Sequence, residues 1–82
     1  MSNLPERQEL IDIINQLKSG DIERTRVSQW AFSIIDDDDI RVTDQIAWKV
    51  IQSLGAVDLP SSDRDYLYGN DDFDEWVKIL AA

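Results

Sequence analysis

The chain of 82 residues contains no cysteine and no histidine. Disulfides, thiolate nucleophiles, Cys/His zinc sites and imidazole acid–base chemistry are therefore all excluded. Long apolar runs are also lacking, because no stretch approaches the roughly 18 residues of a membrane span. Residues 1–6 have neither the basic start nor the apolar run of a signal peptide. We therefore expect a soluble, cytoplasmic protein whose fold is not held by disulfide bonds.

Basic residues are few, with eight against 17 acids and a net charge of −9. The imbalance lies in the second half. Residues 1–35 hold five acids and four bases, a net of −1, whereas residues 36–82 hold twelve acids and four bases, a net of −8. A field of this sign repels nucleic acid and anionic membranes. We therefore expect a basic protein partner, with no direct nucleic-acid contact and no membrane contact.

What the chain does contain is helical periodicity. Apolar residues recur at i, i+3, i+4 and i+7 in four segments, which predicts helices at about residues 5–19, 22–36, 43–54 and 72–81. Four amphipathic helices with mostly short connections predict an all-α fold, a compact four-helix bundle forming a single domain over residues 1–82. The connection before the last helix is long enough for that helix to cross the others instead of lying antiparallel.

Several residues mark the ends of these helices. Gly20 is a good residue to end the first helix, and Asp21 is a plausible N-cap of the second. Thr43 or Asp44 can cap the third helix. Asp72 and Glu75 can form a pair like a capping box at the start of the fourth.

Catalysis is not expected. Serines are present, but no histidine can activate them. The carboxylates lie in charged tracts without an obvious cleft for acid–base work. We therefore expect a binding protein that is not an enzyme and has no cofactor.

The run Asp36, Asp37, Asp38 and Asp39 is the strongest candidate for a cation site, because hard cations bind clustered carboxylates. An EF-hand loop starting at Asp36 would place Arg41 at its glycine position and Ala47 at its final carboxylate position, so it fails. A loop starting at Asp63 would place Leu67 at its fifth position and Tyr68 at its sixth, so it fails as well. A weak, adventitious cation site stays open, but a solvated turn that aids solubility is the favoured interpretation, with no metal site.

The aromatic residues divide into three groups. Trp30 and Trp76 fall on the apolar stripes and are predicted to lie in the core. Phe32 and Trp48 lie off the stripes, where each either packs on a neighbouring element or is exposed at an interface. Two tyrosines are interleaved with acids, and we expect one to be mostly buried and the other available. The residues of this second acidic segment are Asp63, Asp65, Tyr66, Tyr68, Asp71, Asp72, Asp74 and Glu75.

Several segments together form a familiar pattern. They are Arg24-Thr25-Arg26-Val27-Ser28-Gln29-Trp30-Ala31, Ile46-Ala47-Trp48, Leu54-Gly55-Ala56-Val57-Asp58-Leu59, Tyr66-Leu67-Tyr68 and Asp72-Phe73-Asp74-Glu75-Trp76. In these segments the chain resembles a group of small, acidic bacterial proteins that look like immunity proteins of toxin systems. The resemblance covers about residues 10–80. It implies a non-catalytic inhibitor of a cationic toxin, and no functional residue can be carried over from it.

The leading hypothesis is therefore an immunity-type protein that neutralises a cationic toxin, with a nuclease domain as the expected partner. Its predicted binding surface consists of the run at residues 36–39, Trp48 and the second acidic segment. Two alternatives stay open. One is a regulator that mimics nucleic acid, and the other is an adaptor subunit with an exposed apolar patch that includes Phe32 and Trp48.

Overall fold

The computed structural model describes residues 2–59 and 68–82. The elements follow in the order β1 (Ser2–Asn3), α1 (Arg7–Ser19), α2 (Arg24–Ile35), β2 (Ile40–Arg41), α3 (Gln45–Gly55) and α4 (Asn70–Ala81). The predicted all-α four-helix bundle is confirmed. Each helix begins and ends within two residues of the predicted range.

Two of the predicted helix ends are confirmed. Gly20 ends α1 in the left-handed conformation, with φ of 80°, and its N–H donates to the Leu17 carbonyl. Asp44 is the N-cap of α3, where its carboxylate accepts hydrogen bonds from the N–H groups of Ile46 and Ala47.

The predicted N-caps of α2 and α4 are wrong, although both helices begin within two residues of the predicted positions. Glu23, not Asp21, is the N-cap of α2, and its side chain makes no capping hydrogen bond. Helix α4 begins earlier than expected, at Asn70, and the carboxylate of Asp72 accepts a hydrogen bond from the Gly69 N–H at 2.9 Å. Asp72 therefore closes the first turn of α4 from its third position and does not precede the helix.

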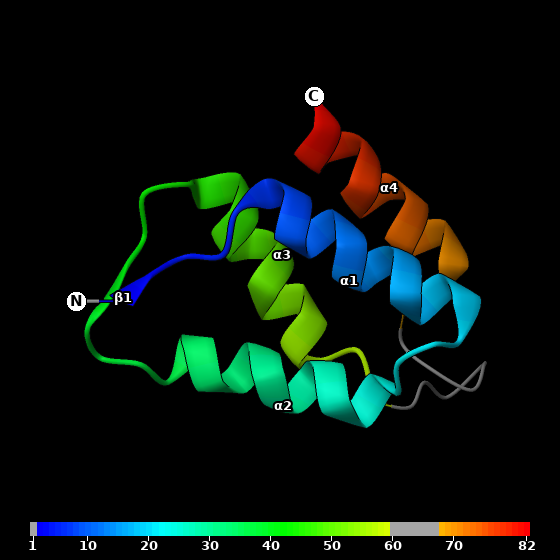
Figure 1. Cartoon of the computed structure of the whole chain (residues 1–82), viewed down its shortest axis with the longest axis horizontal. Helices are drawn as coiled ribbons and strands as arrows, with labels where there is room; N and C mark the ends of the chain where they lie inside the picture. Colours follow the sequence, from blue (N-terminus) through cyan, green and yellow to red (C-terminus); the bar gives the residue numbers. More distant parts are fainter. Residues whose placement is uncertain (1, 60–67) are drawn as a thin grey trace.

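The helices pack in pairs, α1 against α4 and α2 against α3 (Figure 1). Lys18, near the end of α1, forms an ion pair with Asp74, near the start of α4. Helix α4 therefore runs back along α1, and the long connection before it does not carry it across the bundle as the sequence had allowed.

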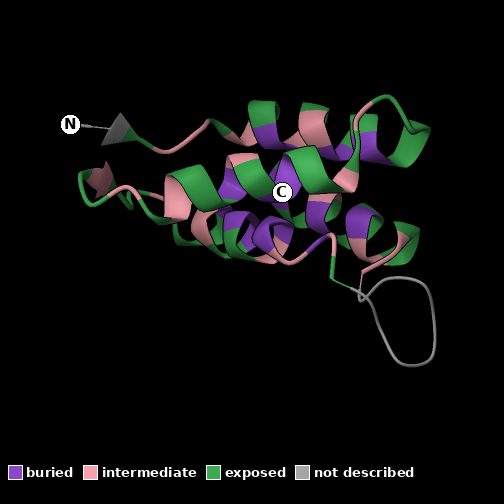
Figure 2. Ribbon diagram, turned by 90° about the horizontal axis from the view of Figure 1, so that it is seen from below, coloured by how far each residue is buried: buried purple, intermediate pink, exposed green. Residues whose placement is uncertain are grey.

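The core lies where the buried faces of all four helices meet (Figure 2). Its buried residues are Leu10, Ile14, Leu17, Val27, Ala31, Ala47, Val50, Ile51, Leu54, Val57, Phe73, Trp76 and Leu80. The expectation that Trp76 lies in the core is confirmed. Trp30 is only partly buried and packs against the edge of the core, so its prediction is correct only in part. It borders a surface pocket together with Ile13 and Arg26, because its position on α2 faces α1 more than the centre.

A short pair of strands was not predicted. β1 and β2 pair in parallel over two residues each, with Ser2 opposite Ile40 and Asn3 opposite Arg41. Two-residue strands leave no alternating pattern that a sequence could reveal. The pairing holds the start of the chain beside the connection between α2 and α3. Among the described residues, no helix is long and apolar enough to cross a membrane.

Helix α3 is held at both of its ends. At the first end, the Arg7 guanidinium donates two hydrogen bonds to the Asp44 carboxylate, from Nε to Oδ2 at 2.6 Å and from Nη2 to Oδ1 at 3.0 Å. At the last end, the buried Ser28 hydroxyl donates to the Gly55 carbonyl at 2.7 Å. A Cβ at Gly55 would lie 3.3 Å from the Ile35 side chain, so glycine lets α2 approach closely here.

The pair formed by Arg7 and Asp44 joins α1 to α3. The hydrogen bond from Arg7 holds the pKa of Asp44 below its ordinary value, helped by the backbone N–H groups that the carboxylate caps. The pKa of Arg7 is raised by the same bond. A bidentate pair of this kind fixes orientation as well as distance.

We predict that Asp44→Asn destabilises the fold at neutral pH, because asparagine keeps the cap but loses the ion pair. The folded pKa of Asp44 lies below its unfolded value, so the carboxylate stabilises the fold above the unfolded pKa of 3.8 and stops doing so as the pH falls through the folded pKa. The difference in unfolding free energy between wild type and variant should therefore shrink as the pH falls below about 5 in urea titrations. Asp38→Asn, at an exposed turn, is the control and should have little effect throughout. A constant difference for Asp44→Asn would contradict the role of the ion pair.

Candidate functional site

The aspartate run is a solvated turn, as the favoured interpretation had it. Asp36, Asp38 and Asp39 are exposed, and Asp37 is partly buried. The Asp39 N–H donates to the Asp37 carboxylate at 2.9 Å, which closes the turn locally. Within the described parts of the chain, no group of three or more acidic side chains is arranged to hold a metal ion.

The second acidic segment is described only in part, since Asp63, Asp65 and Tyr66 lie outside the described residues. Asp71, Asp74 and Glu75 are exposed on α4. Asp74 is paired with Lys18, and Asp72 is engaged by the Gly69 N–H, so two of the acids also serve the fold. Figure 1 places the start of α4 at the opposite end of the molecule from the turn at residues 36–39. The structure therefore does not bring the described part of the second acidic segment, on α4, close to the turn at residues 36–39.

The two described aromatic residues of the predicted surface, Trp48 and Tyr68, are both partly buried. Tyr68 is partly buried, and its ring lies 5.1 Å from that of Trp76 in an edge-on arrangement. Trp76 in turn lies 5.4 Å from Phe73. Trp48 is partly buried as well, whereas Phe32 is 49% exposed. The described tyrosine is thus a packing residue at the end of the bundle, with only part of its surface open to solvent.

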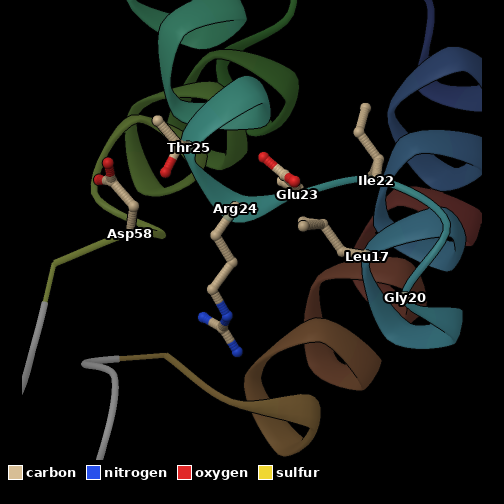
Figure 3. Close-up of a pocket in the computed structure, with 7 residues that line it drawn as sticks. All are labelled: Leu17, Gly20, Ile22, Glu23, Arg24, Thr25 and Asp58. Atoms are coloured by element: carbon tan, nitrogen blue, oxygen red, sulfur yellow. The ribbon is translucent and has the colours of Figure 1, made fainter.

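Arg24 lines a pocket of about 510 Å³ between the start of α2 and the segment after α3 (Figure 3). Its side chain reaches from α2 toward the turn that begins α4. The guanidinium donates to the carbonyls of Val57 at 2.9 Å and Tyr68 at 2.7 Å, and lies 5.2 Å from the centre of the Phe73 ring. Arg24 therefore links the start of α4 to the segment after α3. Its guanidinium stabilises the fold.

The remaining basic side chains divide between paired and unpaired. Arg7 and Lys18 are in ion pairs with Asp44 and Asp74. Four other basic residues are exposed and form no ion pair with any described residue. They are Arg26 on α2, Arg41 in β2, Lys49 on α3 and Lys78 on α4. These four are the cations that the described surface offers to an anionic ligand.

Helices α2 and α3 contain no acidic residue, a feature that the sequence prediction missed. They carry three bases, Arg24, Arg26 and Lys49. The other 59 residues hold five bases and all 17 acids, a net of −12. Counting charge by halves of the chain hid this feature. The absence of acids appears only with the helix bounds of the structure, because the predicted ranges 22–36 and 43–54 also include Glu23, Asp36 and Asp44.

A family model and a curated relative point to the same protein family. The family model described as YxzC DNA-binding protein matches residues 3–80. A curated relative, the uncharacterized protein YxzC of Bacillus subtilis (strain 168), is 38% identical over 72 residues, which covers 84% of this chain and 59% of that protein. The chain thus spans about three-fifths of the length of that relative. No solved structure matches.

These matches overturn the predicted function. They indicate no toxin-immunity family, so the predicted resemblance, the immunity-type function and the toxin partner are wrong. A DNA-binding family also conflicts with the expectation of no direct nucleic-acid contact. The physical reason for the error is that net charge was taken to describe every face of the molecule, whereas a ligand responds to the face that it meets.

We predict that Arg24→Met lowers the free energy of unfolding by about 1.5–3 kcal/mol, because two carbonyls lose a charged donor. Arg26→Met is the matched control on the same helix. Its exposed side chain makes no ion pair with a described residue, so the change should stay within about 0.5 kcal/mol. Urea unfolding followed by tryptophan fluorescence measures both. Equal losses for the two variants would show that Arg24 does not fasten α4.

Proposed function

The chain belongs to the YxzC DNA-binding protein family, and we propose that it binds DNA through the outer faces of α2 and α3. The observation that supports this surface is the absence of acids from both helices in a chain whose net charge is −9. DNA presents a dense row of phosphates, so a carboxylate on the docking face would be strongly unfavourable. The α2–α3 unit is the part of the described fold that best avoids this repulsion.

The exposed side chains of the two helices have suitable chemistry. On α2 they are Thr25, Arg26, Gln29, Phe32 and Ser33, and on α3 they are Gln45, Ile46, Lys49 and Gln52. Arginine and lysine bind phosphates, and hydroxyl and amide side chains donate to phosphates and to base edges alike. Apart from Phe32 and Ile46, these side chains can all donate hydrogen bonds, and none of them is anionic.

We expect the acidic residues outside α2 and α3 to orient the protein relative to DNA. Helix α4 exposes Asp71, Asp74 and Glu75, and the turn after α2 exposes Asp36, Asp38 and Asp39. A phosphate backbone repels these groups, so approach by the α4 side is disfavoured. The same charge weakens long-range attraction, and the proposal is therefore a protein that binds DNA through few contacts at short range.

The proposal does not depend on the helix-turn-helix motif. The connection between α2 and α3 spans residues 36–44, which is longer than the turn of three or four residues in that motif. It rests on charge and exposure. Binding without catalysis and a cytoplasmic location belong to the same proposal, since the chain has no histidine or cysteine for catalysis and bacterial DNA lies in the cytoplasm.

Lys49→Gln tests the surface directly, with Lys78→Gln as its control. Both lysines are exposed on helices, and both changes alter the net charge equally. Lys49→Gln should weaken binding to a labelled random-sequence duplex by about fivefold, roughly 1 kcal/mol, in fluorescence anisotropy. Lys78→Gln should leave affinity nearly unchanged. The reverse order of effects would move the surface to α4.

Salt dependence gives a second readout of the same experiment. Three exposed bases lie on the two helices or in the connection between them, namely Arg26 on α2, Arg41 in β2 and Lys49 on α3. Each phosphate contact contributes about −0.9 to the slope of log affinity against log salt, so the slope should be no steeper than about −3. Lys49→Gln should make it shallower by about one. A slope near −6 would require contacts that this surface does not contain.

A further inference from the structure

Helix α3 presents a narrow polar stripe. Gln45, Lys49 and Gln52 are all exposed, and at 100° per residue they lie within about 60° of one another. The opposite side of the helix is buried in the core through Val50 and Leu54, among others. The stripe therefore points directly away from the bundle, with no acidic residue anywhere on the helix.

The length of the stripe is close to that of three base-pair steps in a DNA duplex. Gln45 and Gln52 are seven residues apart, which is about 10.5 Å along a helix. Successive base pairs are separated by about 3.4 Å, so the stripe spans about three base-pair steps. An α-helix fits the major groove, where glutamine pairs with adenine through two hydrogen bonds and lysine pairs with the acceptors of guanine.

Two observations favour α3 over α2 as the helix that enters the groove. The acid that precedes α3, Asp44, is neutralised by Arg7. Helix α2 instead has exposed carboxylates at both ends, Glu23 and Asp36. A helix flanked by exposed acids meets phosphates on both walls of the groove, which disfavours its insertion.

The ends of α3 are also fixed. Asp44 binds Arg7 at one end, and the Gly55 carbonyl accepts from the buried Ser28 hydroxyl at the other. Reading base edges requires side chains on an element whose position is set by its surroundings. We infer, given the DNA binding proposed above, that α3 enters the major groove of duplex DNA and that Gln45, Lys49 and Gln52 select the sequence of about three base pairs.

The test is selection of binding sites from a random duplex pool by wild type, Gln52→Ala and the control Gln16→Ala. Gln16 is an exposed glutamine on α1, outside the proposed surface. Wild type and Gln16→Ala should select the same short sequence. Gln52→Ala should lose discrimination at one base pair by about 5- to 150-fold and keep it elsewhere. Circular dichroism confirms that each variant is folded.

Modified duplexes locate the contacts. Replacing a selected purine with its 7-deaza analogue removes a major-groove acceptor without changing base pairing, and this should reproduce the loss. Duplex binding without sequence preference, or preference unaffected by Gln52→Ala, overturns the inference and leaves the proposed function standing. Tighter binding to the single strand also overturns it and would favour base stacking on Phe32. Failure of wild type to bind any DNA overturns both proposals.

Discussion

The fixed position of α3 is the constraint on which the rest of the account depends. Arg7 and Asp44 hold its first turn, and Ser28 holds its last carbonyl. Glycine at position 55 lets α2 pack closely against it. Both ends of α3 are fixed, and one side of the helix is buried. Its exposed side therefore faces outward from the bundle. The polar stripe on that side is thus a rigid surface and not a mobile tail.

Charge is divided between the elements in a way that the net value conceals. A chain with pI near 4.1 would ordinarily be assigned a cationic partner. Yet α2 and α3 have no acids, whereas the connections, α4 and, with Glu9 and Asp12, α1 carry all of them. Arg24 adds little to the charge of the surface, because it binds the carbonyls of Val57 and Tyr68. The surface is better described as free of acid than as strongly basic, which implies few phosphate contacts.

The fold was predictable from local signals, and the site was not. Apolar periodicity located all four helices, and Asp44 and Gly20 marked two ends, because stripes and caps are encoded within a few residues. The ties from Arg7 to α3 and from Arg24 to α4 join residues far apart in sequence, so no spacing rule reveals them. Phe32 lay off its stripe and is half exposed, as one of its two interpretations held. The acid-free helices could not be seen from the predicted ranges, because those ranges included acids that only flank α2 and α3 in the structure.

The central claim is that DNA meets the α2–α3 unit. The most direct measurement is a titration of isotopically labelled protein with duplex DNA, followed by backbone amide shifts in the NMR spectrum. The account predicts that the largest shifts fall on α3 around Lys49 and on the exposed side of α2, with little change on α4 around Glu75. Shifts concentrated on α4, with α3 unaffected, would contradict it.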